Sequence, residues 1–247
     1  MRGPPWAPTI RRIAVGLMFV WAAANVILVD YAVSQVHPLI RAVHQQDASS
    51  GVSPNESVPS PLLPEAITNR KISIDTLERR IGLFQLLVVL IGVPTGVGLL
   101  TWQVGAASRL AHLEPSGIRY GPGRVVPAWL VPGVNLVAPV RSVSELLAKT
   151  ESGSTKRFWR RVALAAWWSA CLSYAGLAVA LTATSIASTT QRGRILRDEL
   201  LIAVGLVGLA VAVLSVVLVM WVDARLSDKA IGELRAPWAG WVPARRR

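Results

Sequence analysis

Four long apolar runs constrain this chain more than any other feature of its sequence. They cover Ile13–Val33, Ile81–Val104, Phe158–Ser185 and Leu200–Val222. A helix needs about 20 mostly apolar residues to cross roughly 30 Å of hydrocarbon, and each run meets that length. Hydrophobic residues make up 52% of the chain and charged residues only 16%, a balance far from that of a soluble domain. The sequence therefore predicts an all-α integral membrane protein with four transmembrane helices.

The first run also has features of a secretory signal peptide. Arg11 and Arg12 precede it, and the small residues Ala22, Ala23 and Ala24 lie within it. However, the apolar stretch continues to about twice the length of a normal signal-peptide core. This length favours a retained membrane anchor over a cleaved leader.

The distribution of Lys and Arg predicts the orientation in the membrane. With the N-terminus inside, the cytoplasmic segments are 1–12, 105–157 and 223–247, and the outer loops are 34–80 and 186–199. Eighteen basic residues then lie on the cytoplasmic side, counting those that open the third run, against eight outside. This asymmetry follows the positive-inside rule and places both termini in the cytoplasm. The abundance of Arg, Ala and Val is typical of a GC-rich bacterium, so we expect a multi-pass protein of a bacterial plasma membrane.

The net charge of +12 is high enough to consider nucleic-acid binding. The basic residues cluster at the ends of the apolar runs, where they act as topology signals and attract anionic lipid. We therefore expect the lipid bilayer, and no nucleic acid, among the partners of this chain.

A proline-rich block, Tyr120–Leu147, interrupts the simple pattern of four spans. It is as apolar as a span, but each proline removes a backbone donor and clashes with the preceding helical turn. We therefore predict a cytoplasmic segment that is re-entrant or lies at the membrane interface. A fifth span with the N-terminus outside is the alternative, which the charges before the first run disfavour. The prolines of the block are Pro122, Pro127, Pro132 and Pro139.

Capping patterns predict where helix resumes beside the loops. Asp75 with Glu78 has the spacing of a capping box at the start of the second span. Ser142 with Glu145 repeats that spacing and predicts a short amphipathic helix through Lys149. The outer loop 34–80 is rich in Ser, Pro, Gln and Asn, and we expect it to be flexible.

Seven elements follow one another in order between Leu99 and Lys149. In this order and spacing they resemble the membrane family known as domain of unknown function 4328, which occurs mainly in actinobacteria. The resemblance implies a multi-span membrane protein and supplies no activity. Two positions depart from the family pattern, because Arg109 lies where an Asn is expected and Val140-Arg141 replace an aromatic residue. The elements are Trp102, AASRLAHL, Tyr120-Gly121-Pro122, Trp129-Leu130-Val131-Pro132, Asn135, Pro139 and RSVSELLAK.

Several polar or special residues have a structural and a functional interpretation. Trp129 is expected as an interface anchor, and the Asn135 carboxamide as a bridge to backbone that the prolines leave unpaired. Gly92 and Gly96 around Pro94 form either a close helix contact with a kink or a hinge. On the fourth span, Gly208 and Ala212 suggest a packing face. The acids nearest to span interiors, Asp30 and Asp223, are expected at the interface.

No pattern in the sequence brings a nucleophile and a base together, and none has metal-ligand spacing. We therefore expect no catalytic residue, no cofactor and no metal site. The main hypothesis is a non-enzymatic membrane subunit or scaffold that binds another membrane or cytoplasmic protein through the proline block. A transporter or channel component, with the block as a re-entrant gate and Pro94 as a hinge, is the alternative. Self-association is left open.

Overall fold

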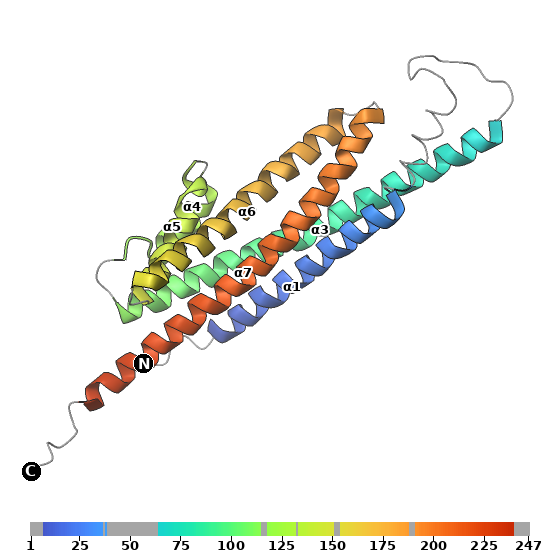
Figure 1. The fold of residues 1–247 in the computed structure, drawn as a ribbon. Helices are drawn as coiled ribbons and strands as arrows, with labels where there is room; N and C mark the ends of the chain where they lie inside the picture. Colours follow the sequence, from blue (N-terminus) through green and yellow to red (C-terminus); the bar gives the residue numbers. More distant parts are fainter. Residues whose placement is uncertain are drawn as a thin grey trace, which may run out of the picture. The chain divides into compact units, whose positions relative to one another are not determined.

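The computed structural model describes residues 7–36, 38, 64–114, 118–131, 133–150, 154–187 and 191–239. The described part is helical and contains no strand, so the predicted all-α class is confirmed (Figure 1). In chain order the elements are α1 (Ala7–Tyr31), the π-helix η1 (Ala32–Val36), α3 (Pro64–Leu113), α4 (Pro122–Leu130), the 3-10 helix η2 (Val134–Leu136), α5 (Ala138–Thr150), α6 (Ser154–Ala187) and α7 (Gln191–Ala239).

Four of these helices contain a segment that is long and apolar enough to cross a membrane. The segments coincide closely with the four apolar runs predicted from the sequence. Hydropathy identified them because length and apolar content are local properties of the chain. They are Pro8–Ser34, Arg79–Leu113, Arg157–Thr184 and Leu196–Gly232.

Two helix starts differ from the sequence-based expectation. α3 begins at Pro64, so residues 64–80 are helical where a flexible loop was expected, and Asp75 lies inside the helix instead of capping it. Proline is well suited to the first helical position, where its missing N–H has no partner to lose. α7 likewise begins at Gln191, which makes 191–199 helical. Residues 37 and 39–63 of the expected outer loop lie outside the described residues.

The chain forms two compact units, and each of the four long helices contributes to both. Unit 1 comprises Met1–Phe19, Val93–Leu172 and Val211–Arg247. Unit 2 comprises Val20–Gly92 and Ser173–Ala210. The proline block therefore belongs entirely to unit 1.

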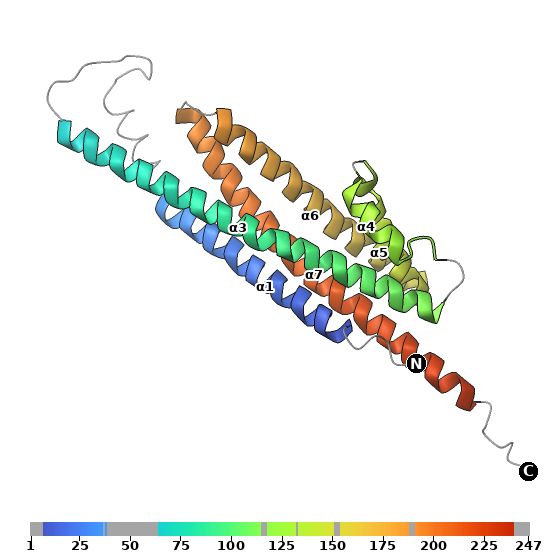
Figure 2. The same ribbon diagram turned by 180° about the vertical axis from the view of Figure 1, so that it is seen from behind.

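Unit 1 is built around a core of large apolar side chains. α4 and α5 lie against the parts of α3 and α6 that belong to this unit (Figures 1 and 2). α5 turns one face inward, and its buried residues follow the helical spacing of an amphipathic stripe. The fully buried side chains of the unit include Met18, Trp102, Leu110, Val125, Val143, Leu147, Trp167, Val219 and Leu226.

Unit 2 is held by close contacts between its helices. The rings of Trp21 on α1 and Tyr174 on α6 meet edge to face, with centroids 5.3 Å apart. Gly205 and Gly208 let α7 approach Asn25, which is fully buried. On the outside of the unit α3 displays a row of exposed leucine and valine side chains, as a lipid-facing helix does.

Candidate interaction site at the proline hairpin

We call residues 118–150, apart from the undescribed Pro132, the proline hairpin. It consists of α4 and α5 joined through η2. At a rise of 1.5 Å per residue, the nine residues of α4 extend about 14 Å, and the thirteen residues of α5 about 20 Å. Neither helix is long enough to cross about 30 Å of hydrocarbon.

Proline and glycine positions explain the path of the hairpin. Gly121 is extended, and Pro122 occupies the first turn of α4, where proline is favoured. Gly133 has a φ of 79°, a left-handed conformation that favours glycine, and it turns the chain into η2. Pro139 lies in the first turn of α5, which again needs no N–H.

Trp129 connects α4 to α3 through Gln103. The indole Nε1 donates a hydrogen bond of 2.7 Å to the Gln103 Oε1 atom. The Gln103 amide then donates to the Ser142 hydroxyl, and that hydroxyl donates to the Pro139 carbonyl at 3.2 Å. Gln103 and Ser142 are both buried, so these bonds supply the partners that buried polar groups need. Trp129, expected as an interface anchor, is therefore a tie between α4 and α3.

Trp168 on α6 supports the turn of the hairpin. Its Nε1 donates a hydrogen bond of 2.7 Å to the Leu136 carbonyl in η2. The rings of Trp168 and Trp129 also pack edge to face, with centroids 6.0 Å apart. Neither Gln103 nor Trp168 was predicted from the sequence. Gln103 could have been, because a polar amide inside the apolar run Ile81–Val104 needs a hydrogen-bond partner.

Glu145 has a different role from the expected helix cap. α5 begins at Ala138, four residues before Ser142, so the Ser142–Glu145 capping box predicted from the spacing does not form. Instead, the Glu145 carboxylate accepts hydrogen bonds from the backbone N–H groups of Arg119 and Tyr120, at 2.6 and 2.8 Å. This carboxylate therefore holds the chain that leads into α4.

The other residues of the seven family elements lie in different environments. Trp102 is buried in the core of unit 1, and Tyr120 lies under the Arg119 guanidinium, 5.9 Å from its ring centroid. Asn135 donates its backbone N–H to the Val131 carbonyl at 3.0 Å. Its carboxamide makes no hydrogen bond to the described residues, so the expected bridging role is not seen. Pro132 lies outside the described residues.

The two glycines proposed as a hinge have different surroundings. A Cβ atom on Gly92 would lie 3.2 Å from the Trp21 Nε1 atom, whereas one on Gly96 would meet nothing within 4 Å. α3 stays helical through Pro94. Gly98 makes the corresponding close contact in unit 1, where its Cβ would lie 3.3 Å from Leu17 Cδ1. Close helix packing therefore accounts for Gly92 and Gly98, and Gly96 takes no part in it.

Asp223 forms an ion-pair cluster in unit 1. Its carboxylate pairs with Arg11 at 2.7 Å and with Arg109. Asp223 is only 5% exposed, so this acid near the end of the fourth run is buried within the protein. Arg109, which departs from the family pattern, therefore connects α3 to α7. Asp30 is exposed, as an interfacial acid would be.

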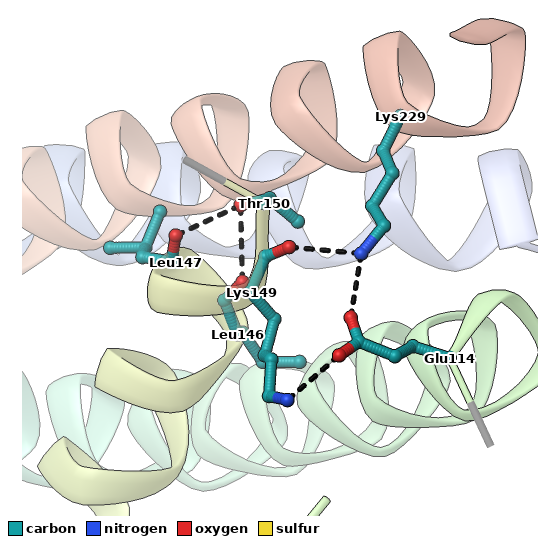
Figure 3. A network of polar contacts seen from close by, with 6 residues as sticks. All are labelled: Glu114, Leu146, Leu147, Lys149, Thr150 and Lys229. Atoms are coloured by element: carbon teal, nitrogen blue, oxygen red, sulfur yellow. Dashed lines mark hydrogen bonds and ion pairs between the residues drawn. The ribbon is translucent and has the colours of Figure 1, made fainter. Parts of the chain in front are cut away.

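A second cluster joins the chain just after α3, the last turn of α5 and the C-terminal part of α7. Figure 3 shows Lys149 and Lys229 converging on the Glu114 carboxylate, each at 2.7 Å. Lys229 also donates to the Lys149 carbonyl at 3.0 Å. The hydrogen bonds from Lys149 and then Lys229 lower the pKa of Glu114 from 4.5 to about 2. These bonds fix the last turn of α5 and so the base of the hairpin.

The hairpin also exposes large apolar side chains, although hydrogen bonds attach it to α3 and α6. Leu130 is 70% exposed, the most exposed of a group of large apolar side chains. Two exposed arginines, Arg124 and Arg141, belong to the same hairpin. Several large apolar side chains exposed on one short segment are suited to a membrane or a protein partner. We call this group the apolar face of the hairpin; it comprises Val126, Leu130, Val131, Val134, Leu136 and Val137.

Comparison with known proteins identifies the family and no relative of known function. The profile of the family described as domain of unknown function (DUF4328) matches residues 70–224. No curated protein and no solved structure matches the chain. Within the described residues no group of His, Cys, Asp or Glu side chains is arranged to hold a metal ion. Because the match covers more than half of the chain, the protein belongs to the DUF4328 family.

Proposed function

We propose that this chain is a non-enzymatic subunit or scaffold of a bacterial plasma membrane. In this proposal four helices span the bilayer, both termini are cytoplasmic, and the proline hairpin lies in the cytoplasmic leaflet. The observation that carries the proposal is a hairpin fixed by hydrogen bonds to α3, to α6 and within itself that nevertheless exposes apolar side chains.

The chemistry of the hairpin favours a partner that is itself embedded in the membrane. Arg124 and Arg141 are suited to the anionic headgroup layer, and an apolar face between them is suited to the hydrocarbon just beneath it. A face held in a fixed geometry loses little conformational freedom on binding, which favours recognition of a protein surface. The apolar side of a partner's transmembrane helix would fit this face.

Photocrosslinking at the apolar face tests the proposal. Leu130 is replaced by a benzoylphenylalanine in the full chain, which is expressed in its native membrane and irradiated. We expect one membrane protein to be crosslinked, and the same protein to co-purify with the wild-type chain in mild detergent. The double variant Leu130→Ser, Leu136→Ser should lose that partner.

The matched control changes two exposed apolar residues elsewhere. Leu206→Ser with Val213→Ser alters α7, where both side chains are about half exposed. This variant should retain the partner. Crosslinks to lipid alone, or equal co-purification with both double variants, would show that the hairpin is not a docking surface for a protein.

The transporter or channel alternative has less support. Three buried polar side chains in the candidate spans make hydrogen bonds to neighbouring groups. Asn25 donates to the Trp21 carbonyl at 2.8 Å, and Ser215 accepts from Trp167 at 2.9 Å. Thr95 donates to the Leu17 carbonyl at 3.3 Å. Such bonds are common ties within and between membrane helices. A continuous water-accessible stripe in a cysteine scan of α3 and the hairpin would favour the alternative over our proposal.

A further inference from the structure

A groove in unit 2 runs along α3 and combines a cation with an apolar floor. Its volume is about 610 Å³, which is within the usual range for small-molecule sites. From Arg80 to Leu90 the helix rises about 15 Å, about the depth of one hydrocarbon leaflet. The lining residues are Tyr31, Arg80, Leu83, Phe84, Leu86, Leu87 and Leu90.

The polarity of the groove changes along its length. Arg80 lies at one end, next to the start of the candidate span Arg79–Leu113. An arginine at this position extends its guanidinium into the headgroup layer. Leu83, Leu87 and Leu90 follow at successive turns within the span and are all substantially exposed. The groove thus has a positive end at headgroup depth and an apolar remainder at acyl-chain depth.

Tyr31 and Phe84 form the aromatic part of the groove, and the Arg80 guanidinium is its charged part. The Tyr31 ring packs on Phe84 with centroids 5.0 Å apart and forms a wall of the groove. The Tyr31 hydroxyl is buried and has no hydrogen-bond partner among the described residues. No described side chain forms an ion pair with Arg80. A ligand with negatively charged oxygens at the Arg80 end would provide a partner for this guanidinium.

We propose that this groove binds one anionic glycerophospholipid. The phosphate lies at the Arg80 guanidinium, and one acyl chain follows Leu83, Leu87 and Leu90. Charge complementarity selects a negatively charged headgroup, and the apolar length of the groove requires an acyl chain. The site belongs to unit 2, so it is independent of the partner proposed for the hairpin.

Thermal unfolding of the full chain in a neutral detergent tests this site. The probe is dioleoyl phosphatidylglycerol, added at increasing concentration, with native mass spectrometry counting the bound lipids. We expect one retained lipid and a rise in Tm. Arg80→Gln should weaken the apparent lipid affinity about tenfold, because it removes a charge-assisted contact to the phosphate. Leu87→Trp should also abolish retention, by filling the groove.

Arg79→Gln is the matched control, since Arg79 is exposed and does not line the groove. It should bind the lipid as the wild type does, and all variants should have the wild-type helical content in lipid-free detergent. An equal Tm shift in wild type and Arg80→Gln would overturn the proposal. The same holds if inorganic phosphate alone reproduces the shift, or if Leu87→Trp retains the lipid.

Discussion

Gly208 lies on the face of α7 that packs against Asn25 and Tyr174 in unit 2. A Cβ atom at this position would lie 2.5 Å from the Asn25 Oδ1 atom and 3.1 Å from the Tyr174 ring. Asn25 has little room to withdraw, because it is fully buried and its amide donates to the Trp21 carbonyl. The packing face predicted from the sequence at Gly208 is therefore present, and only glycine fits there.

Gly208→Ala should consequently destabilise the protein. Overpacking of a close contact costs about 1–3 kcal/mol, and we expect a loss of this size in unfolding experiments in detergent. Gly176→Ala on α6 is the control, since a Cβ atom there meets nothing within 4 Å. That variant should be neutral or slightly more stable, because alanine favours helix. Equal stability of the two variants would contradict the close contact at Gly208.

The lowered pKa of Glu114 predicts that the stability of the folded protein depends on pH. Hydrogen bonds with Lys149 and Lys229 lower the pKa of Glu114 from 4.5 to about 2. A carboxylate with a lowered pKa in the folded state stabilises the protein above the unfolded value. Its contribution is therefore present above pH 4.5 and is lost as the pH falls towards 2.

The measurement is the difference in unfolding free energy between wild type and Glu114→Gln. This difference should be constant from pH 7 to about 5 and shrink below pH 4.5, because protonation makes the wild-type side chain neutral as well. Other carboxyl groups titrate in the same range, and comparing the two proteins removes their effect. A difference that does not change with pH would show that the Glu114 cluster does not form in solution.

At the scale of elements, the attachment of α4 to α3 depends on Trp129. Trp129→Phe keeps the aromatic ring and leaves the Gln103 Oε1 atom buried without its donor. An unsatisfied buried acceptor costs about 1–3 kcal/mol. We expect this loss of stability together with faster hydrogen exchange at the amides of α4 and η2.

The control for Trp129 is Trp159→Phe on α6. Trp159 is 64% exposed, so its replacement should change neither stability nor exchange in the hairpin. If hairpin exchange in Trp129→Phe equals that of the control, the hydrogen bond to Gln103 does not hold α4 in place.

The long helices and the hairpin differ in how far they could be predicted. The spans depend on apolar length, which the sequence shows directly, and the prolines mark where a straight helix ends. The start of α3 at Pro64 was missed because residues 64–80 are too polar for a span, although Pro64 suits a first helical position. The partners of Glu145 and Trp129 follow from how α3, α4 and α5 pack, which spacing along the chain does not reveal.

At the scale of the whole molecule, charge and helix length together constrain the topology. Eighteen basic residues lie on the side expected in the cytoplasm, counting Arg160 and Arg161 at the start of the third run, against eight outside. The hairpin adds a geometric argument, since neither α4 nor α5 can cross the hydrocarbon alone. Both arguments support our proposal that the two ends of the α4–η2 segment lie on the same side of the membrane.

Labelling of single cysteines in cells tests this topology. In a Cys171→Ala background, Arg119→Cys and Arg141→Cys introduce thiols at exposed positions on either side of α4 and η2. Both should react with a membrane-impermeant maleimide only after permeabilisation, because the segment between them enters and leaves on the cytoplasmic side. Glu199→Cys, exposed on α7 next to the expected outer loop, should react in intact cells. Five spans with the N-terminus outside would instead put residue 119 outside and residue 141 inside. If Arg119→Cys reacts in intact cells and Arg141→Cys does not, the four-span topology is wrong and the five-span topology is right.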